Sequence, residues 1–387
     1  MSAYDEKLSE LEKIELKDYK EHDKKFLVYF LGDIPSRSRP PKDNSFDDDR
    51  GDYIANKGSN IYFRYEVISH MGKGSFGKVY KVYDHKEKLE VALKILKCFP
   101  MDKNQIDLEP EILMYLKKKW QKENHTLWKY HIIDIQEYFE FRLHKCIIVP
   151  IHDINLYEKI KELNFEGFTV DIIRRMTIQL LKCLKFLKEN KIIHWDLKPE
   201  NVLLKNKQKS GIVIIDFGSS CFENKKMYAY IQSRFYRAPE VLLGIPYSYP
   251  IDMWSLGWIL LELYQGFPIF PGENEKEQMG LIMELRGVPP INLIEEASRR
   301  DIFFDKNLMP IPVMDNTGEV LRPNSKSLAH FIEPEDKKFF KFIDAWLHWD
   351  PDLRMTPEEA LRHDWILESI PDELQAEYLQ FLSKSKS

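Results

Sequence analysis

Cysteine is scarce in this sequence, and long apolar runs are missing. Its four cysteines, Cys98, Cys146, Cys183 and Cys221, lie far apart, with no CxxC pair and no spacing typical of a metal site. This pattern favours reduced thiols inside a cell over a disulfide-stabilised secreted protein. No segment approaches the roughly 18 consecutive apolar residues that a membrane-spanning helix needs, and the acidic first residues do not look like a signal peptide. We therefore expect an intracellular protein, in the cytoplasm, the nucleus or both, without a membrane partner.

A dominant sign of charge is also missing. The 387 residues include 57 Lys and Arg against 62 Asp and Glu, a net charge of only −5. This balance predicts no nucleic-acid partner, because nucleic acids attract strongly basic surfaces. The sequence carries no signal for an oligomeric state. What the chain does have is 43% hydrophobic residues, enough for a sizeable core.

The hydrophobic pattern changes along the chain. Between residues 61 and 150 it is mostly that of strands, as in YEVISHMG, KVYKVYD and EVALKIL, with one helix expected over roughly 104–119. From 151 to 387 apolar residues recur with a helical period. The pattern predicts an α+β protein with a β-rich small lobe followed by a mainly helical large lobe. Residues 1–60 form a separate N-terminal segment, and about 286–327 look like a loop-rich insert.

A glycine-rich loop lies between two of the expected strands. Gly72, Gly74, Gly77 and Val79 form a G-x-G-x-x-G-x-V pattern, and Lys94 follows on an apolar strand. Glycine lets the backbone approach a phosphate closely, and a lysine nearby can bind phosphate oxygens. By itself such a loop is often only a structural hairpin, and a lone lysine is often only a strand-edge charge. Together they favour a phosphate site.

A second group of polar residues follows the long helical pattern. Asp196, Lys198 and Asn201 lie in the segment HWDLKPEN, and Asp216 begins DFG after a short apolar strand. Phosphoryl transfer to a hydroxyl needs a carboxylate that orients the nucleophile, a cation near the moving phosphoryl group, and oxygen ligands for Mg²⁺. This group supplies all three. A DFG alone would more often be a turn that ends a strand.

The order of these motifs decides whether each is a structural turn or part of one site for phosphoryl transfer. Glycine loop, strand lysine, H-x-D-x-K-x-x-N, DFG and APE occur in one order, which resembles the eukaryotic protein kinases over about residues 65–370. SSCFENKKMYAYIQSRFYRAPEVLLG is similar to the dual-specificity tyrosine-phosphorylation-regulated kinase family of the CMGC group. SFDDDRGDYI looks like that family's acidic homology box, and YFLG with the following Pro/Ser/Arg linker resembles the accessory region of its class 2 members.

The resemblance implies a bilobal kinase fold, protein substrates, and ATP with Mg²⁺ as cofactors. Asp196 would be the catalytic base, Lys198 and Lys94 would complete the catalytic set, and Asn201 and Asp216 would bind the metal. Residues that would bind ATP are Gly72, Gly74, Ser75, Gly77, Val79, Ala92, Lys94, Glu109, Val149, Pro150, Ile151, His152 and Asn155.

The resemblance also implies structural and regulatory roles. Tyr230 would be autophosphorylated, and Arg234 and Arg237 would read its phosphate. Glu240 would pair with Arg354 to brace the large lobe. Asp252 would support the catalytic loop, and residues 1–60 would pack on the small lobe.

Three residues depart from the family pattern. Trp195 and Trp258 replace smaller or basic residues, which predicts local repacking without loss of the chemistry. Pro110 directly follows Glu109 and disfavours helical dihedrals there. Either the helix starts near Pro110, or Glu109 does not pair with Lys94.

The expected function is transfer of the ATP γ-phosphate to Ser or Thr of proteins, with tyrosine autophosphorylation. A pseudokinase scaffold that binds partners without turnover is the main alternative. A small-molecule kinase on the same fold is a further one, although the APE segment favours a peptide substrate.

Overall fold

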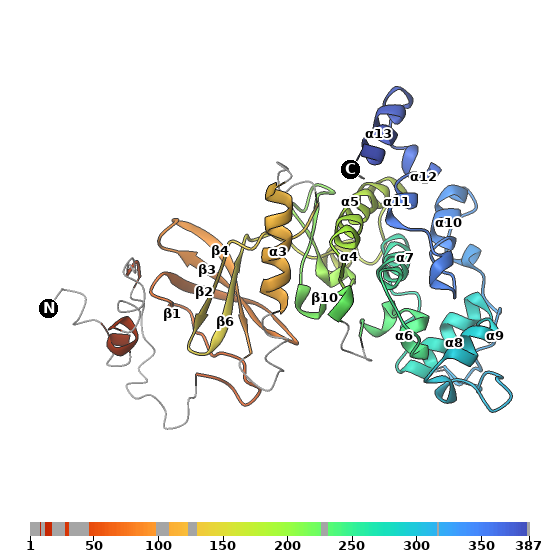
Figure 1. Ribbon diagram of the computed structural model, residues 1–387, viewed down its shortest axis with the longest axis horizontal. Coiled ribbons are helices and arrows are strands. Elements are labelled where there is room, and N and C mark those ends of the chain that lie inside the picture. The colour runs from red at the N-terminus through yellow and green to blue at the C-terminus, as the bar shows by residue number, and fades with distance from the viewer. Residues whose placement is uncertain are drawn as a thin grey trace. The chain divides into compact units, whose positions relative to one another are not determined.

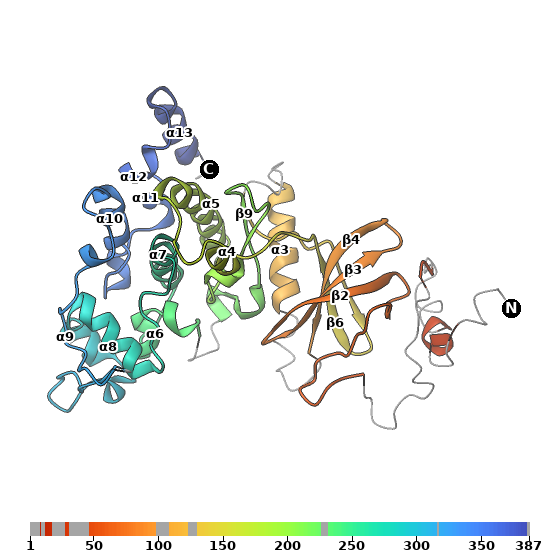
Figure 2. The same ribbon diagram turned by 180° about the vertical axis from the view of Figure 1, so that it is seen from behind.

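The computed structural model describes residues 8, 12–17, 28–30, 46–97, 108–122, 130–225, 231–315 and 317–384. The chain divides into two compact units (Figures 1 and 2). The small unit comprises Met1–Glu123 and Ile133–Ile151, and the large unit comprises Asn124–Ile132 and His152–Ser387. Among the described residues, no helix is both long and apolar enough to cross a membrane.

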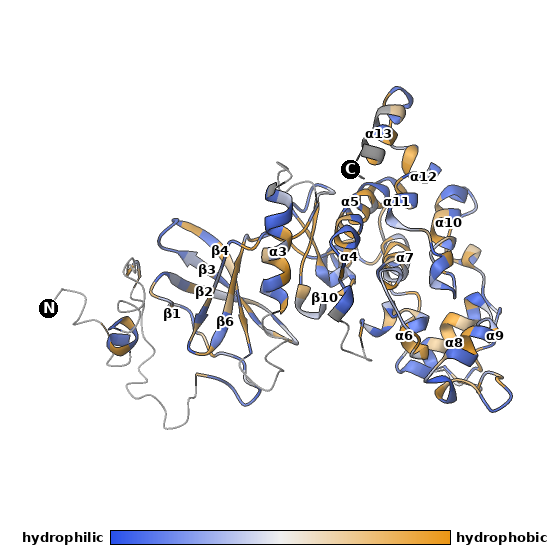
Figure 3. Ribbon diagram, in the orientation of Figure 1, coloured by the Kyte–Doolittle hydropathy of each residue, from blue (hydrophilic) through white to orange (hydrophobic). Residues whose placement is uncertain are grey.

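The small unit is built on an antiparallel sheet with the strand order β1-β2-β3-β4-β6-β5. Its strands are β1 (Asn60–Ile61), β2 (Tyr65–Gly74), β3 (Gly77–Asp84), β4 (Leu89–Leu96), β5 (Glu137–Phe141) and β6 (His144–Val149). Strand β6 is coloured mainly as apolar in Figure 3, as expected for a strand inside a sheet.

The two faces of this sheet differ in chemistry. Along β4, Val91, Leu93 and Ile95 are buried in one apolar cluster, which also includes Tyr80 of β3. Side chains alternate along a strand, so Lys94 belongs to the opposite face. The sheet therefore presents an apolar core on one side and a polar group on the other.

The N-terminal segment packs against the small unit where the structure describes it. Tyr53 is buried in the apolar cluster. Nε2 of the buried His144 lies 2.6 Å from Oδ1 of Asp47, and its Nδ1 lies 2.6 Å from the Leu96 carbonyl oxygen. Arg142 donates from Nε to Glu15 over 2.8 Å. The acidic box and residue 15 are thus fixed to the sheet by a buried ring, a histidine and an ion pair.

Helix α3 (Leu108–Lys122) of the small unit carries Glu109 and Glu111 in its first turn. It begins at Leu108, so Pro110 lies in its first turn, where backbone N–H groups have no intrahelical partner. Pro110 therefore removes no helical hydrogen bond. Glu109 is buried, with 4% of its surface exposed.

The large unit is mainly helical, with two small two-stranded sheets. The strands are β7 (Ile192–Ile193), β8 (Val202–Leu204), β9 (Ile212–Ile214) and β10 (Cys221–Phe222). The helices are α4 (Leu156–Glu162), α5 (Val170–Glu189), α6 (Pro239–Leu243), α7 (Pro250–Gln265), α8 (Glu275–Arg286), α9 (Ile291–Glu296), α10 (Lys337–Asp344), α11 (Pro357–Ala360), α12 (Asp364–Leu367) and α13 (Asp372–Lys384).

Two details of the large unit differ from the sequence pattern. The insert contains the helix α9. Residues 130–132 pack with the large unit although they precede β5 and β6, because the His131 carbonyl oxygen accepts from the Ile214 amide over 2.7 Å. A contact between residues so distant in the chain leaves no local signal in the sequence.

Candidate active site

One face of the small sheet gathers residues expected to bind ATP. Val79 of β3 lies directly opposite Lys94 of β4, and Ala92 of β4 lies opposite Val149 of β6. Residues that are directly opposite share a face, and Ala92 and Lys94 are two apart on one strand. The register therefore brings these four side chains to one face across three adjacent strands.

The ammonium group of Lys94 is held by Glu109. Its Nζ lies 2.8 Å from Oε1 and 2.7 Å from Oε2 of that carboxylate. The first of the two alternatives left by Pro110 is therefore the observed one, since α3 starts at Leu108 and the pair still forms. The Lys94 side chain keeps 15% of its surface exposed. An ammonium that is positioned but accessible can bind further oxygens.

The glycines of the loop fall into two classes. Gly77 has φ +157°, and a Cβ there would come within 2.1 Å of the Ile95 carbonyl oxygen, so the sheet itself excludes a side chain. A Cβ at Gly72 would meet nothing within 4 Å, and one at Gly74 would meet only a carbonyl oxygen at 4.0 Å. The open space above Gly72 and Gly74 fits a ligand that approaches the backbone closely.

The segment after β6 contains four of the residues expected to bind ATP. Pro150 and Ile151 are half-buried at the end of the small unit. Burial lowers the pKa of His152 in the large unit, with a smaller effect from Lys205, so its ring is neutral at neutral pH. Asn155 caps α4, where its side-chain oxygen accepts from the Glu158 amide over 2.8 Å. Asn155 thus has a structural task in addition to the expected one.

The carboxylate of Asp196 lies in a dense hydrogen-bond network. Its Oδ2 accepts from Lys198 Nζ over 2.6 Å. Its Oδ1 accepts from both the amide and the hydroxyl of Ser233, over 3.0 and 2.7 Å. These bonds fix both oxygens of the expected base in position.

Ser233 was not among the residues singled out from the sequence. It lies in the YIQSRFYR segment, and its hydroxyl also accepts from Lys198 Nζ over 3.0 Å. Beside it, the buried Gln232 donates to the Ile251 carbonyl oxygen and accepts from the Ala238 amide. The only local signal was the family resemblance of this segment, because the partners are distant in sequence.

The two expected metal ligands are positioned differently. Asn201 is buried, and its Nδ2 donates to the Asp196 carbonyl oxygen over 2.8 Å, which leaves its side-chain oxygen as the atom that could ligate a metal. Asp216 adopts the left-handed region with φ 61°, just before the buried Phe217. The described residues contain no cluster of three or more His, Cys, Asp or Glu side chains able to hold a metal. Two oxygens suit Mg²⁺, which keeps waters and substrate phosphates as its other ligands.

Asp252 supports the catalytic loop from α7. Its Oδ2 accepts from the His194 amide over 2.8 Å, and its Oδ1 from the Trp195 amide over 3.1 Å. Burial raises the pKa of Asp252 to about 7, and the two backbone hydrogen bonds oppose that rise. Trp195 has φ 69°, a rare conformation for a bulky residue, so this anchorage holds a strained turn.

The two unexpected tryptophans are buried. The ring of Trp195 packs edge-on against Tyr247, with centroids 5.6 Å apart. Trp258 packs against Trp254 and Phe270, with centroids 5.8 and 4.6 Å away. Both rings therefore pack against aromatic side chains, and repacking relative to other family members stays a prediction.

Tyr230 lies outside the described residues, so its role stays a prediction. Arg237 is buried, and it donates to Glu275 over 2.9 Å and to the Gln232 carbonyl oxygen over 2.8 Å. Arg234 donates to the carbonyl oxygens of Gly272 and Glu273. In this structure both guanidinium groups are bonded to the segment at the start of α8.

A buried ion pair braces the large unit. Nη1 and Nη2 of Arg354 lie 2.6 and 2.7 Å from Oε1 and Oε2 of Glu240. Arg354 also lies over the Trp254 ring, with its guanidinium carbon 4.9 Å from the centroid. The pair joins the APE segment to the loop before α11, as the resemblance implied.

Comparisons with known proteins agree with this geometry. The protein kinase domain family matches residues 65–366. The chain is 45% identical to human dual specificity tyrosine-phosphorylation-regulated kinase 4 over 95% of its own length and 70% of that protein. It is 46% identical to Drosophila melanogaster dual specificity tyrosine-phosphorylation-regulated kinase 2, over 93% of its length. The chain belongs to the family of dual-specificity tyrosine-phosphorylation-regulated kinases.

Relatives differ in how much of their length this kinase spans. It covers 49% of the Drosophila protein and 33% of the DYRK-family kinase pom1 of Schizosaccharomyces pombe, to which it is 43% identical. In both comparisons 93% of this kinase is aligned. The similarity therefore extends beyond the catalytic motifs, while the rest of those two proteins lies outside the aligned region.

Proposed function

We propose that this kinase transfers the γ-phosphate of ATP to Ser and Thr hydroxyls of proteins, with Mg²⁺, and phosphorylates its own Tyr230. The observation that carries the proposal is the network around Asp196, whose two oxygens are fixed by Lys198 and Ser233. It holds a carboxylate in a fixed position beside an ammonium group of the large unit, and activation of a substrate hydroxyl needs such a carboxylate.

The residues have separate tasks in the reaction. Asp196 orients the substrate hydroxyl and accepts its proton as the hydroxyl oxygen bonds to the γ-phosphorus and the bond to the ADP oxygen breaks. The Ser233 hydroxyl already donates to Oδ1 over 2.7 Å, so this oxygen accepts an aliphatic O–H donor. Lys198 offsets negative charge on the transferred group. Lys94, fixed by Glu109, binds phosphate oxygens, and Gly72 and Gly74 leave room for the nucleotide.

The metal would be held by Asn201 and Asp216. When bound, Mg²⁺ supplies positive charge that neutralises the phosphate oxygens. Asp196 fixes Asn201 through its own carbonyl oxygen, so the expected base and one metal ligand are positioned by the same loop. We also propose an intracellular location, from the sequence pattern alone.

The test is phosphate incorporation by protein produced in bacteria. Purified kinase is incubated with ATP and Mg²⁺ and a mixture of Ser/Thr peptides, followed by phosphosite mapping of both. We expect phosphate on the peptides and on Tyr230, and neither with Asp216→Asn. A folded wild-type protein that binds ATP but modifies nothing would favour a pseudokinase scaffold. Bare Tyr230 in an enzyme active on peptides would remove the autophosphorylation site alone.

A further inference from the structure

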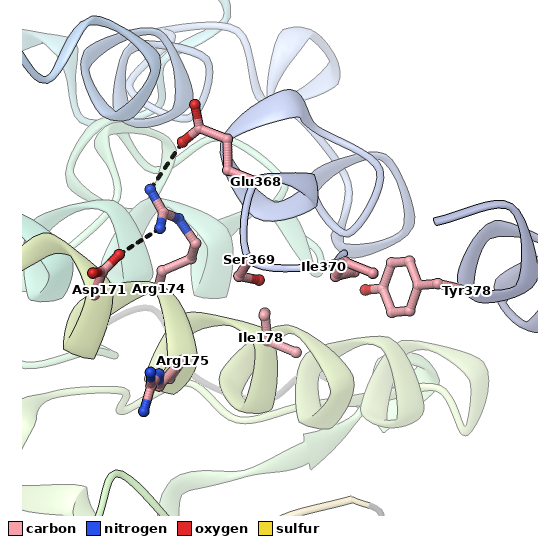
Figure 4. Close-up of a pocket in the computed structure, with 8 residues that line it drawn as sticks. All are labelled: Asp171, Arg174, Arg175, Ile178, Glu368, Ser369, Ile370 and Tyr378. Carbon is pink, nitrogen blue, oxygen red and sulfur yellow. Dashed lines mark hydrogen bonds and ion pairs between the residues drawn. The ribbon is translucent and has the colours of Figure 1, made fainter. Parts of the chain in front are cut away.

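A cavity of about 430 Å³ lies in the large unit, between the first half of α5 and the segment that joins α12 to α13 (Figure 4). Arg174 in its wall is already paired, since Nη1 lies 2.7 Å from Oδ1 of Asp171 and Nη2 lies 3.0 Å from Oε2 of Glu368. Lys338 lies 2.6 Å from Oε1 of Glu368, so the charges of this network balance. These ion pairs join elements of the large unit, and their members are not among the residues assigned to the reaction.

The ion pairs of the acidic box are different, because two of them end on the glycine-rich loop of the small unit. Nζ of Lys73 lies 2.6 Å from Oδ2 of Asp52, and Nζ of Lys78 lies 3.1 Å from Oδ2 of Asp48. Lys73 belongs to β2 and lies inside the glycine motif, and Lys78 is the second residue of β3. The N-terminal segment is therefore tied to both strands of the loop.

The two lysines lie directly opposite each other in the hairpin. Like charges at directly opposite positions repel and weaken the pairing of the strands. Side chains alternate along a strand, so Lys78 lies on the face away from its neighbour Val79, which shares a face with Lys94. The aspartates thus neutralise the lysine pair from the face opposite to Lys94, and they leave the face of Lys94 open.

The acidic box is itself a compact and anchored body. The Asp48 amide donates to the Asp52 carbonyl oxygen over 2.9 Å, and the Ile54 amide donates to the Phe46 carbonyl oxygen over 2.7 Å. Oδ1 of Asp48 also accepts from the Asp52 amide over 3.0 Å. Tyr53, in the same box, is buried in the apolar cluster of the sheet. The box therefore has an attachment to the sheet that does not depend on its contacts with the loop.

The pair of Asp52 and Lys73 is the stronger of the two. The Asp52 side chain is 0% exposed, and Lys73 is the only cation paired with it among the described residues. In the same part of the chain, its buried Oδ1 has no hydrogen-bond partner. Separating a buried carboxylate from its counterion is strongly unfavourable, so Asp52 holds Lys73 in place. Asp48 is 33% exposed, and water screens its attraction for Lys78 more effectively.

A loop that is held in place before the nucleotide arrives loses less conformational entropy when it binds. We propose that Asp52 and Asp48 are positioning residues for the nucleotide, which hold the glycine-rich loop through Lys73 and Lys78 and so raise the affinity for ATP and ADP. They act only through these two lysines, because they lie on the face away from Lys94. This inference rests on the proposed function, which assigns the loop to ATP.

The test measures the Kd of ADP with Mg²⁺ by calorimetry on the full chain, together with kcat and the KM values for ATP and for a Ser/Thr peptide. Asp52→Asn keeps the size of the side chain and removes its charge, so the Kd and the KM for ATP should rise about tenfold. Both kcat and the peptide KM should stay within about twofold of the parent, because only nucleotide binding is affected. Asp48→Asn should raise the Kd about threefold, since its pair is more exposed.

Lys73→Met separates the positioning role from stability. It removes the same pair but leaves Asp52 as an unpaired buried charge, so its melting temperature should fall well below that of Asp52→Asn. Its Kd for ADP should nevertheless rise by the same factor of about ten, and the double variant Asp52→Asn with Lys73→Met should show no further rise. The double variant lacks the unpaired charge, so it replaces Lys73→Met in the comparison if that variant does not fold.

Two variants that lose an ion pair elsewhere serve as controls. Lys81→Met removes the partner of Glu90 on β3, outside the loop. Glu368→Gln removes a partner of Arg174 beside the cavity. Both should keep the parental Kd for ADP and the parental KM for ATP.

Three outcomes would overturn this inference in a parent protein that binds ADP. A parental Kd in Asp52→Asn would mean that the ion pair does not position the loop. A Kd that rises in Lys73→Met but not in Asp52→Asn would mean that Lys73 binds the phosphates itself. A Kd that follows the melting temperature across all variants would mean that the box only stabilises the fold. A parent that binds no ADP would overturn the proposed function as well, so the two failures are distinguishable.

Discussion

Two ion pairs, one in each unit, join a cation to a glutamate at similar distances but differ in surroundings. Side chains of Arg354 and Glu240 are 0% and 2% exposed, against 15% and 6% for Lys94 and Glu109. Arg354 also donates to the carbonyl oxygen of His348 over 2.9 Å. A planar guanidinium that is bonded on several sides is fixed, whereas a partly exposed ammonium can share its donors with a ligand. The first pair stabilises the fold, and the second positions a reactive group.

The largest effect is expected for Lys94→Arg. The change keeps the charge but replaces a compact ammonium by a wide fork beside Glu109, so phosphate oxygens are no longer bound in the right place. We expect activity to fall by about 10³-fold, with a melting temperature close to that of the parent. Lys81→Arg alters another lysine of the same sheet, paired with Glu90, and should retain activity. If Lys94→Arg turns over as fast as the parent, Lys94 is not the residue that positions the phosphate oxygens.

Arg354→Met tests whether the buried pair of Arg354 and Glu240 stabilises the fold. It leaves the Glu240 carboxylate buried without its partner, which should cost about 3–5 kcal/mol of unfolding free energy in urea titration. The double variant Arg354→Met with Glu240→Leu should recover most of this loss, because it removes the unpaired charge as well. Activity per folded molecule should change much less than in Lys94→Arg. A single variant as stable as the parent would contradict a bracing role.

A smaller effect is expected on lowering the pH, through Asp252. With a pKa of about 7, this carboxyl gains a proton near neutrality and then loses one of its two backbone hydrogen bonds to the catalytic loop. We expect kcat to fall about tenfold from about pH 8 to about pH 6. Asp252→Asn should start lower and lack this dependence. An identical pH profile in both proteins would assign the titration to another group.

The same group should act on stability with the opposite sign. Its pKa is raised from the ordinary value of 3.8, so the folded protein binds this proton more tightly than the unfolded chain. Its contribution to stability is therefore largest below about pH 4 and declines as the pH rises to about 7. The difference in unfolding free energy between parent and Asp252→Asn, measured across this range, checks the sign.

The smallest effect is expected for Pro110→Ala, which addresses the Lys94–Glu109 pair directly. Proline fits the first turn of α3 and restricts the unfolded chain, so its loss should cost at most about 1 kcal/mol. Activity should be unchanged, because the helix begins before this position. Urea titration measures the unfolding free energy, and a steady-state assay measures the activity. A large loss of activity would mean that the proline itself sets the position of Glu109.

Particular residues show how far sequence alone could go. The two-lobed α+β organisation and the pairing of Arg354 with Glu240 followed from pattern and resemblance, and both are present. The Lys94–Glu109 pair stayed open because the rule against helix before proline is local, and only the start of α3 resolves it. Ser233 was missed because its partner Asp196 is remote in sequence. The cavity between α5 and the segment that joins α12 to α13 depends on packing between distant helices, so it leaves no motif in the sequence.

Strand β4 has a consequence for how reliably the chain folds. Leu93 and Lys94 are neighbours, yet one is buried in the apolar cluster and the other reaches the Glu109 carboxylate. A slip of one residue in pairing would exchange them, placing an ammonium among aromatic rings and a leucine beside an acid. Every such error carries a penalty on both faces at once, so the strand discriminates strongly against misaligned sheets during folding. The residue needed for phosphate binding therefore also helps the sheet select its alignment.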